Sequence, residues 1–161
     1  MFRDMRRKKQ ELSIASCEKV INECTSGVLA LQGDNEYPYA VPLSYCYQNG
    51  KLYFHSAAEG HKLNAIKNNS KCSFCIISKD EVVPEKFTTF FRSVICFGRI
   101  KVLESTEDKI RVLNLLSDKY SPDVDMSARE EEIETSLNRV AVLELDVEHM
   151  TGKQCIEFVK G

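Results

Sequence analysis

The chain has 161 residues, with 22 basic and 24 acidic side chains and a formal net charge of −2. This length suits one domain, and the balanced charge excludes a whole-molecule field that would attract nucleic acid or an anionic membrane surface. Any anion site must therefore be local. No apolar run approaches the roughly 18 residues that span a bilayer, and the seven cysteines form no regular disulfide framework. These features predict a soluble, cytoplasmic protein with reduced thiols.

The N-terminal segment "MFRDMRRKKQ" is basic and lacks the apolar core and small-residue cleavage site of a secretory signal. We expect a solvated basic arm over residues 1–12, with a nucleic-acid tail as the alternative. A helix is predicted to open at Ser13, because Ile14, Cys17, Ile21 and Cys24 then share one face. The apolar run "SGVLALQG" follows and predicts a buried strand closed by a turn.

The strongest local signal is Asn49-Gly50, which separates two alternating aromatic runs. This pair is the preferred two-residue hairpin loop, because both residues tolerate positive φ. Such a loop pairs Gln48 with Lys51, and the same register carried outward places Ser44 opposite His55.

Alternation along this hairpin separates a core face from a face that borders a groove. The predicted core face holds Leu43, Tyr45, Tyr47, Leu52, Phe54 and Ser56, and the groove face holds Ser44, Cys46, Gln48, Tyr53 and His55. Pro42 cannot donate to a sheet ladder, so this part of the strand is predicted to lie at an edge or a bulge.

The remaining segments predict strands in "KCSFCIIS", "FTTFFRSVICFGRIKVLES" and "VAVLELDVEHM", with Gly98 as a bend in the second. Two helices are predicted from capping boxes. The first, in "STEDKIRVLNLLSDKYSP", pairs Ser105 with Asp108 and places Ile110 on its apolar stripe together with two leucines; the second, in "SAREEEIETSLNR", begins at Ser127. About six strands without strict βαβ alternation favour a mainly β (α+β) fold, an antiparallel barrel with flanking short helices. No linker divides residues 13–161, which we expect to form a single domain.

Metal chemistry finds little support. Cys72-x-x-Cys75 lies in a predicted strand, where positions three apart point to opposite faces, and no second Cys-x-x-Cys pair exists. His55 and His61 lack a third ligand of the usual type nearby. We therefore predict no metal site and interpret the two cysteines as core residues.

The segment "FHSAAEGHKLNAI" instead has the composition of an anion site. Ser56 and Glu59 have capping-box spacing for a helix running to about Asn68, so the amides of residues 57–60 would be free at the helix start. His61 and Lys62 add positive charge in a first turn that normally disfavours cations, so a negative group should compensate them. A solvated lysine and a surface histidine are the alternative. A nucleophilic serine is not supported, since no Gly-x-Ser-x-Gly elbow is present.

Three stretches together resemble a known family: "YAVPLSYCYQNGKLYFHSAAEGHKLNAIKNN", "EKFTTFFRSVICFGRI" and the terminal "EHMTGK". They are similar to the FMN-binding split-barrel family related to pyridoxamine 5'-phosphate oxidase, and most similar to its nitroimidazole-resistance-like branch. The likeness runs from Ser13 to about Lys153. It implies a six-stranded antiparallel split β-barrel and a homodimer that binds FMN at the subunit interface.

Carried over by motif, the resemblance implies nine cofactor-binding residues, namely Val41, Pro42, Leu43, Ser44, His55, Ser56, His61, Lys62 and Ser93. Residues 41–44 would lie along the flavin ring and ribityl chain, and His55 and Ser56 would follow at the strand end. His61 and Lys62 would hold the phosphate. The serine at position 93 would reach the ring from the other subunit.

The resemblance implies an FMN-dependent oxidoreductase that passes electrons from NADH or NADPH to a small organic acceptor such as a nitro compound or a quinone. No nucleic-acid or membrane partner is expected. No catalytic residue is identified; His55 is a candidate proton donor because its ordinary pKa is near neutral. Ala40 and Tyr45 replace an arginine and a lysine of true pyridoxamine phosphate oxidases, which argues against vitamin-phosphate oxidation. A flavin-binding module without turnover and a haem protein with His149 as axial ligand are the alternatives.

Overall fold

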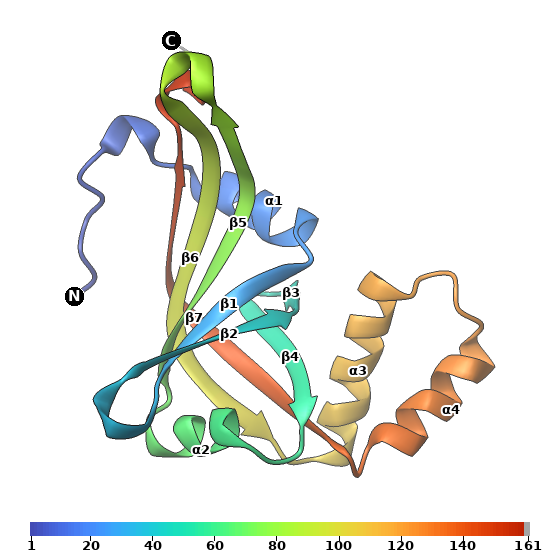
Figure 1. The fold of residues 1–161 in the computed structure, drawn as a ribbon. Coiled ribbons are helices and arrows are strands. Elements are labelled where there is room, and N and C mark those ends of the chain that lie inside the picture. The colour runs from blue at the N-terminus through green and yellow to red at the C-terminus, as the bar shows by residue number, and fades with distance from the viewer. Residues whose placement is uncertain (160–161) are drawn as a thin grey trace.

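The computed structural model describes residues 1–159. Seven strands form one antiparallel sheet in the order β2-β1-β5-β6-β7-β4-β3, which curls into an open split barrel (Figure 1). The strands are β1 (Ser26–Gln32), β2 (Pro38–Ser44), β3 (Cys46–Gln48), β4 (Lys51–Ala57), β5 (Lys71–Val83), β6 (Thr88–Leu103) and β7 (Val140–Gln154). The helices are α1 (Ile14–Glu23), α2 (His61–Asn68), α3 (Thr106–Tyr120) and α4 (Met126–Ser136). The predicted architecture is confirmed, with seven strands in place of six.

The predicted hairpin forms at Asn49 and Gly50, which have φ values of 52° and 78°. β3 and β4 pair in the expected register, with Gln48 opposite Lys51. Beyond β3 the predicted register is wrong, because β2 leaves β4 and pairs with β1, so that Ser44 faces Ser26 and not His55.

The strand is interrupted at Tyr45, between β2 and β3, because a side chain from α3 forms hydrogen bonds with the Tyr45 backbone. The Tyr45 amide donates to the Tyr120 hydroxyl at 2.9 Å, and the same hydroxyl lies 2.7 Å from the Tyr45 carbonyl oxygen. It also contacts the carbonyl oxygen of Thr25, which precedes β1. The hydroxyl accepts the Tyr45 amide proton and can donate its own proton to one of the two carbonyl oxygens at a time, at the point where β2 departs from the hairpin.

Aromatic side chains fill the barrel interior. Tyr45, Phe54 and Phe74 are fully buried, and Phe74 meets the other two rings edge-on at centroid distances of 5.1 and 5.0 Å. α1 covers one side of this core and is capped as predicted, with the Ser13 hydroxyl accepting the Ser16 amide at 3.2 Å. The predicted apolar face of α1 is partly wrong, since its first residue, isoleucine, is 58% exposed.

Two backbone predictions in the sheet are confirmed. Pro42 lies on β2, an edge strand, where its missing N–H costs no ladder hydrogen bond. The pairing of β6 with β7 shifts between Phe97 and Gly98. A side chain at Gly98 would collide with the Asp146 carbonyl, so only glycine permits this close approach.

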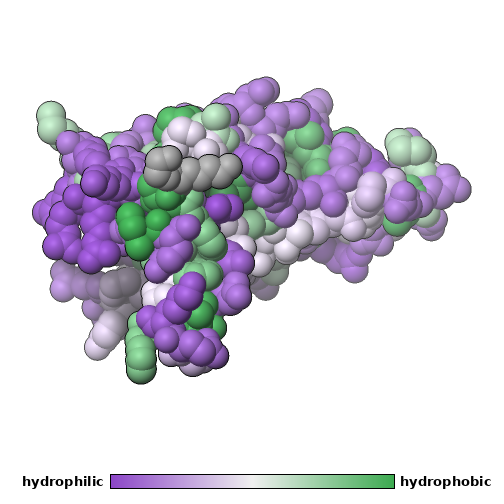
Figure 2. Space-filling model, turned by 90° about the horizontal axis from the view of Figure 1, so that it is seen from above, coloured by the Kyte–Doolittle hydropathy of each residue, from purple (hydrophilic) through white to green (hydrophobic). Residues whose placement is uncertain are grey.

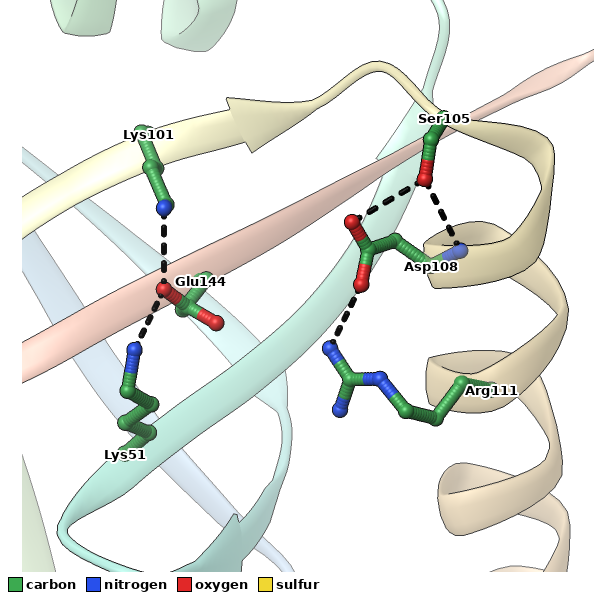
Figure 3. Close-up of polar contacts among 6 residues, drawn as sticks. All are labelled: Lys51, Lys101, Ser105, Asp108, Arg111 and Glu144. Carbon is green, nitrogen blue, oxygen red and sulfur yellow. Dashed lines mark hydrogen bonds and ion pairs between the residues drawn. The ribbon is translucent and has the colours of Figure 1, made fainter.

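α3 and α4 form a hairpin that stands beside β4 on the outer face of the sheet (Figure 1). The predicted start of α3 is confirmed, with the Ser105 hydroxyl accepting the Asp108 amide at 3.1 Å (Figure 3). Ile110 of its predicted stripe is, however, 39% exposed, because the buried face is centred on Val112, Leu113 and Leu116. The predicted start of α4 at Ser127 is wrong, because Asp125 is the N-cap and the helix begins at Met126.

Under the start of α3 the outer face of the sheet buries a charged residue. Glu144 on β7 is 5% exposed, and its Oε1 lies 2.7 Å from Lys51 Nζ and 3.2 Å from Lys101 Nζ (Figure 3). Burial alone would raise the pKa of Glu144, but the two lysines outweigh it and hold the pKa below its ordinary value. The buried charge is therefore paired from both neighbouring strands.

Most residues of the N-terminal arm are exposed, and a few fix it to the barrel. Gln10 is buried, the Leu12 amide donates to the Gly152 carbonyl at 2.9 Å, and Phe2 stacks on His149 with centroids 4.6 Å apart. In the described part of the chain, no helix combines the length and hydropathy needed to cross a membrane.

The prediction that Cys72 and Cys75 are both core residues is right for Cys72 and wrong for Cys75, which packs in neither buried cluster. All seven are free thiols, and β5 directs Cys72 toward the barrel core while Cys75, three positions on, lies on the opposite face. Within residues 1–159 no group of three or more histidine, cysteine, aspartate or glutamate side chains is arranged to hold a metal ion.

Candidate functional site

The link between β4 and α2 differs from the prediction. β4 continues through Ser56 to Ala57, and its pairing with β7 holds both residues in extended backbone. The Ser56 hydroxyl donates to the Ala57 carbonyl at 3.1 Å, so the predicted capping box at this serine is wrong. α2 begins at His61, with Gly60 as its N-cap at a φ of 132°.

The start of α2 nevertheless has the features of an anion site. No acidic residue lies in its first turn, and the amides of His61 and Lys62 have no hydrogen-bond partner within residues 1–159. Lys62 is half-buried, and its ammonium group makes no ion pair with any described residue. Burial lowers the pKa of Lys62. A half-buried cation beside free helix amides fits a phosphate or another anion.

The neighbouring His61 already has partners. Its ring stacks on Tyr39 with centroids 4.2 Å apart, and its Nε2 lies 3.5 Å from the Asp34 carboxylate. Both partners come from the β1–β2 connection and the start of β2. The two residues predicted to hold a phosphate are therefore placed differently, one engaged within the chain and the other available.

His55 lies on the outer face of β4, close to Lys62. Partial burial, followed by the charge of Lys62, lowers the pKa of His55 below its ordinary value. Neither ring nitrogen has a hydrogen-bond partner within the described chain. The lowered pKa favours the neutral imidazole, which can donate from one nitrogen and accept at the other.

The four predicted residues on β2 divide between two faces. Val41 and Leu43 pack against the barrel core, so they could touch a ligand at the strand edge only through their backbone. Pro42 and Ser44 are exposed on the outer face. Ser93 lies on β6, and β1 and β5 separate that strand from β2 in the sheet.

Ser44 and His55 meet at a pocket of about 400 Å³ between the outer face of β4 and the α3–α4 hairpin. Its other lining residues are Leu113, Leu116, Ser117, Tyr120, Ser121, Glu132, Ile133, Ser136 and Val140. The structure thus brings the two predicted groove residues together, although they do not pair across a hairpin. The helical walls were not predicted, because the acidic run of α4 has the pattern of a solvated helix.

The sheet order and flanking helices define the class, an antiparallel split-barrel protein. The profile of the pyridoxamine 5'-phosphate oxidase family matches residues 13–154, so the chain belongs to this family. A comparison with curated proteins finds no match.

Solved structures share the fold at low sequence identity. A conserved hypothetical protein from Mycobacterium tuberculosis aligns with a TM-score of 0.81 and 16% identity, covering 94% of this chain and 90% of that one. A candidate 5-nitroimidazole antibiotic resistance protein from Bacteroides thetaiotaomicron aligns with a TM-score of 0.75 and 23% identity, covering 89% of this chain and 86% of that one. An FAD and haem binding protein from Mycobacterium smegmatis aligns with a TM-score of 0.76 and 18% identity, covering 95% of this chain and 76% of that one.

Proposed function

We propose that this protein binds FMN and passes electrons from a reduced nicotinamide to a small organic acceptor. The observation that carries the proposal is the start of α2, where Lys62 is a half-buried cation without a partner in the described chain, beside free helix amides. Membership of the pyridoxamine 5'-phosphate oxidase family supports it. So does the fold shared with proteins whose names describe FAD binding.

In this proposal the chain binds and orients the cofactor. Lys62 and the first amides of α2 hold the phosphate, and Ser44 and the edge of β2 face the ring system. His55, whose lowered pKa favours the neutral ring, offers a donor and an acceptor between them. A bound flavin supplies hydride and electron transfer, for which the protein provides position and electrostatic environment.

We further propose that the site is completed by a second copy of the chain. Strand register places Pro42, Val28, Cys75 and Ile95 in one row across the outer face of four adjacent strands. In the next row outward Ile77, which pairs with Ser93, is 63% exposed. Because β1 and β5 separate β6 from β2 within one chain, Ser93 would reach the ring from the partner.

The free end of the β5–β6 hairpin carries more exposed apolar surface. Val82 and Phe87 are 70% and 98% exposed, and Figure 2 shows hydrophobic surface at this end beside the hydrophilic N-terminal arm.

Sedimentation of the flavin-loaded protein tests whether two chains assemble, and we expect a dimer. A monomer that retains one flavin per chain would contradict it.

The phosphate assignment is tested by Lys62→Met. We expect FMN affinity to fall by about tenfold to a hundredfold, the loss of one charge-assisted contact. Lys67→Met is the matched control, because Lys67 lies exposed in the last turn of the same helix and should leave affinity unchanged. His61→Ala should weaken FMN less, since Asp34 already engages that histidine. Equal retention in Lys62→Met and Lys67→Met would reject the assignment.

Turnover is tested separately from binding. NADH or NADPH is added to the flavin-loaded protein without oxygen, and the flavin absorbance at about 450 nm is followed. Bleaching by either nucleotide supports an oxidoreductase. Persistent colour with both would favour a flavin-binding module without turnover.

Haem binding is the second candidate, and one observation favours it. Nε2 of His149 is buried and has no hydrogen-bond partner within residues 1–159, as a prospective axial ligand would be. Phe2 stacks on the same ring, so haem binding there would require the N-terminal arm to move. An intense absorbance band near 400 nm, roughly where haem absorbs, would support this candidate in place of flavin.

A further inference from the structure

The pocket between β4 and the α3–α4 hairpin extends beyond the residues assigned to the flavin. Of its lining, only Ser44 and His55 belong to the proposed cofactor site, and α3, α4 and the start of β7 supply the rest. The pocket therefore adjoins the cofactor site and has walls of its own.

The polar groups of these walls carry negative charge or none. Glu132 is the one acidic lining residue, and no lysine or arginine lines the pocket. Its carboxylate accepts a hydrogen bond from the Ser136 hydroxyl at 2.8 Å and makes no ion pair with any described residue. The same helix carries three more glutamates, at positions 130, 131 and 134. The nearest basic residue of α4, Arg129, is already paired with Asp118 at 2.5 Å.

The apolar part of the wall suits a ring. Leu113, Leu116, Ile133 and Val140 contribute branched aliphatic surface, and serine and tyrosine hydroxyls are interspersed among them. A volume of about 400 Å³ lies in the range of small-molecule sites, and apolar walls with a few polar groups are typical of such sites.

We propose that this pocket binds an uncharged or cationic ring compound beside the flavin and that Glu132 disfavours anionic ones. The inference rests on the proposed function and specifies the class of acceptor that the protein takes. The regions on the two sides of His55 then prefer ligand groups of opposite charge. Phosphate is held on the Lys62 side, and the ring compound binds on the Glu132 side.

Three nitrobenzene derivatives of similar size provide matched probes: 4-nitrobenzylamine, 4-nitrobenzyl alcohol and 4-nitrobenzoate carry charges of about +1, 0 and −1 near neutral pH. Their affinities are measured by calorimetry on the oxidised, flavin-loaded protein, so no electron transfer is needed. We expect the amine and the alcohol to bind about tenfold or more tighter than the benzoate at low salt. Equal affinity of all three, or tightest binding of the benzoate, would overturn the inference.

Glu132→Gln keeps a hydrogen-bond acceptor for Ser136 and removes the charge. It should lower the ratio of amine to alcohol affinity by about threefold to tenfold, whereas Glu131→Gln on the same helix, outside the pocket lining, should leave the ratio unchanged. An equal effect of both variants would attribute the preference to the general field of α4 and overturn the role of Glu132.

Ser117→Phe fills the pocket, and Ser136→Phe fills it from the other helix if the first variant does not fold. Loss of probe binding with normal FMN retention supports the inference. Loss of FMN from a folded variant would assign the pocket to the cofactor and overturn it. Conversely, a wild-type protein that holds no flavin but binds the probes in the expected charge order would refute the proposed function and leave the pocket assignment standing.

Discussion

The barrel interior and the layer under the α3–α4 hairpin are two apolar regions on opposite faces of the same strands, and they are packed differently. Nineteen buried residues form the interior cluster and eight form the outer one. β4 shows the division within one strand: Leu52 and Phe54 enter the barrel, and Tyr53 between them lies under α3.

The difference follows from what covers each face. Inside the barrel, the curled sheet, α1 and α2 bury the side chains, and rings such as Phe54 and Phe74 pack edge to face with centroids 5.0 Å apart. Outside, two helices cover only part of the sheet, and the pocket next to His55 lies where their cover ends. The interior therefore supplies most of the stability, and the outer layer leaves room for a ligand.

The largest effect we expect comes from a cavity on the fully enclosed side. Phe54→Ala should lower the free energy of unfolding by about 3 to 5 kcal/mol, because the surrounding rings cannot collapse into the space. Ile133→Ala, in the outer cluster next to the pocket, should cost about 2 kcal/mol, since its cavity opens toward solvent-accessible space. Urea unfolding of the two apoproteins measures both. Equal losses would remove the distinction between the two regions.

The next prediction concerns Glu144, the buried charge on the outer face of the sheet. In the double variant Lys51→Met/Lys101→Met, Glu144 stays buried without a cation, which should cost about 3 kcal/mol at neutral pH. Lys19→Met, which breaks only the exposed pair with Glu23, should cost less than about 1 kcal/mol.

This prediction includes a dependence on pH. The pKa of Glu144 is held below its ordinary value of 4.5 in the folded protein, so its stabilising effect is present above that value and is lost as pH falls through the folded pKa. The deficit of the double variant should therefore shrink in acid. Urea unfolding at neutral pH and near pH 4 measures the change, and an identical deficit at both would contradict the pairing.

The same comparison shows what the sequence could predict. Features determined by a few neighbouring residues were predicted correctly: the Asn49-Gly50 hairpin, the caps at Ser13 and Ser105, and the bend at Gly98. Pro42 belongs with these, because its missing donor restricts the position of a strand whatever the partner. Each depends on local backbone chemistry that one short stretch contains.

The features that failed depend on distant residues. Carrying the hairpin register past Tyr45 was wrong because the hydroxyl of Tyr120, 75 positions away, ends that pairing. The capping box at Ser56 was wrong because pairing with β7 extends β4 through that residue. The pocket was predicted only through Ser44 and His55, since nothing in the spacing of α4 shows which of its glutamates lines it.

Tyr120 connects the two regions, so removal of its hydroxyl should cause a stability loss of intermediate size. Tyr120→Phe removes the group that satisfies the Tyr45 backbone and contacts Thr25, and should cost about 1 to 3 kcal/mol. Tyr47→Phe removes one part-buried hydroxyl contact with Glu18 and should cost less than about 1 kcal/mol. Urea unfolding compares them. A loss in Tyr120→Phe no larger than in the control would show that water replaces the hydroxyl where β2 leaves the hairpin.

The smallest effect is on His55, at the boundary between the outer layer and the start of α2. Partial burial and the charge of Lys62 lower its pKa, so the folded protein binds fewer protons than the unfolded chain just below pH 6.5. Stability therefore rises with pH between the folded value and 6.5, and is lost as pH falls through that window. NMR titration of the imidazole should show a pKa below 6.5 in the apoprotein. Lys62→Met should raise it only part of the way, because burial is the larger cause, and Lys67→Met should leave it unchanged. A full return to 6.5 in Lys62→Met would contradict burial as the larger cause of the lowered pKa.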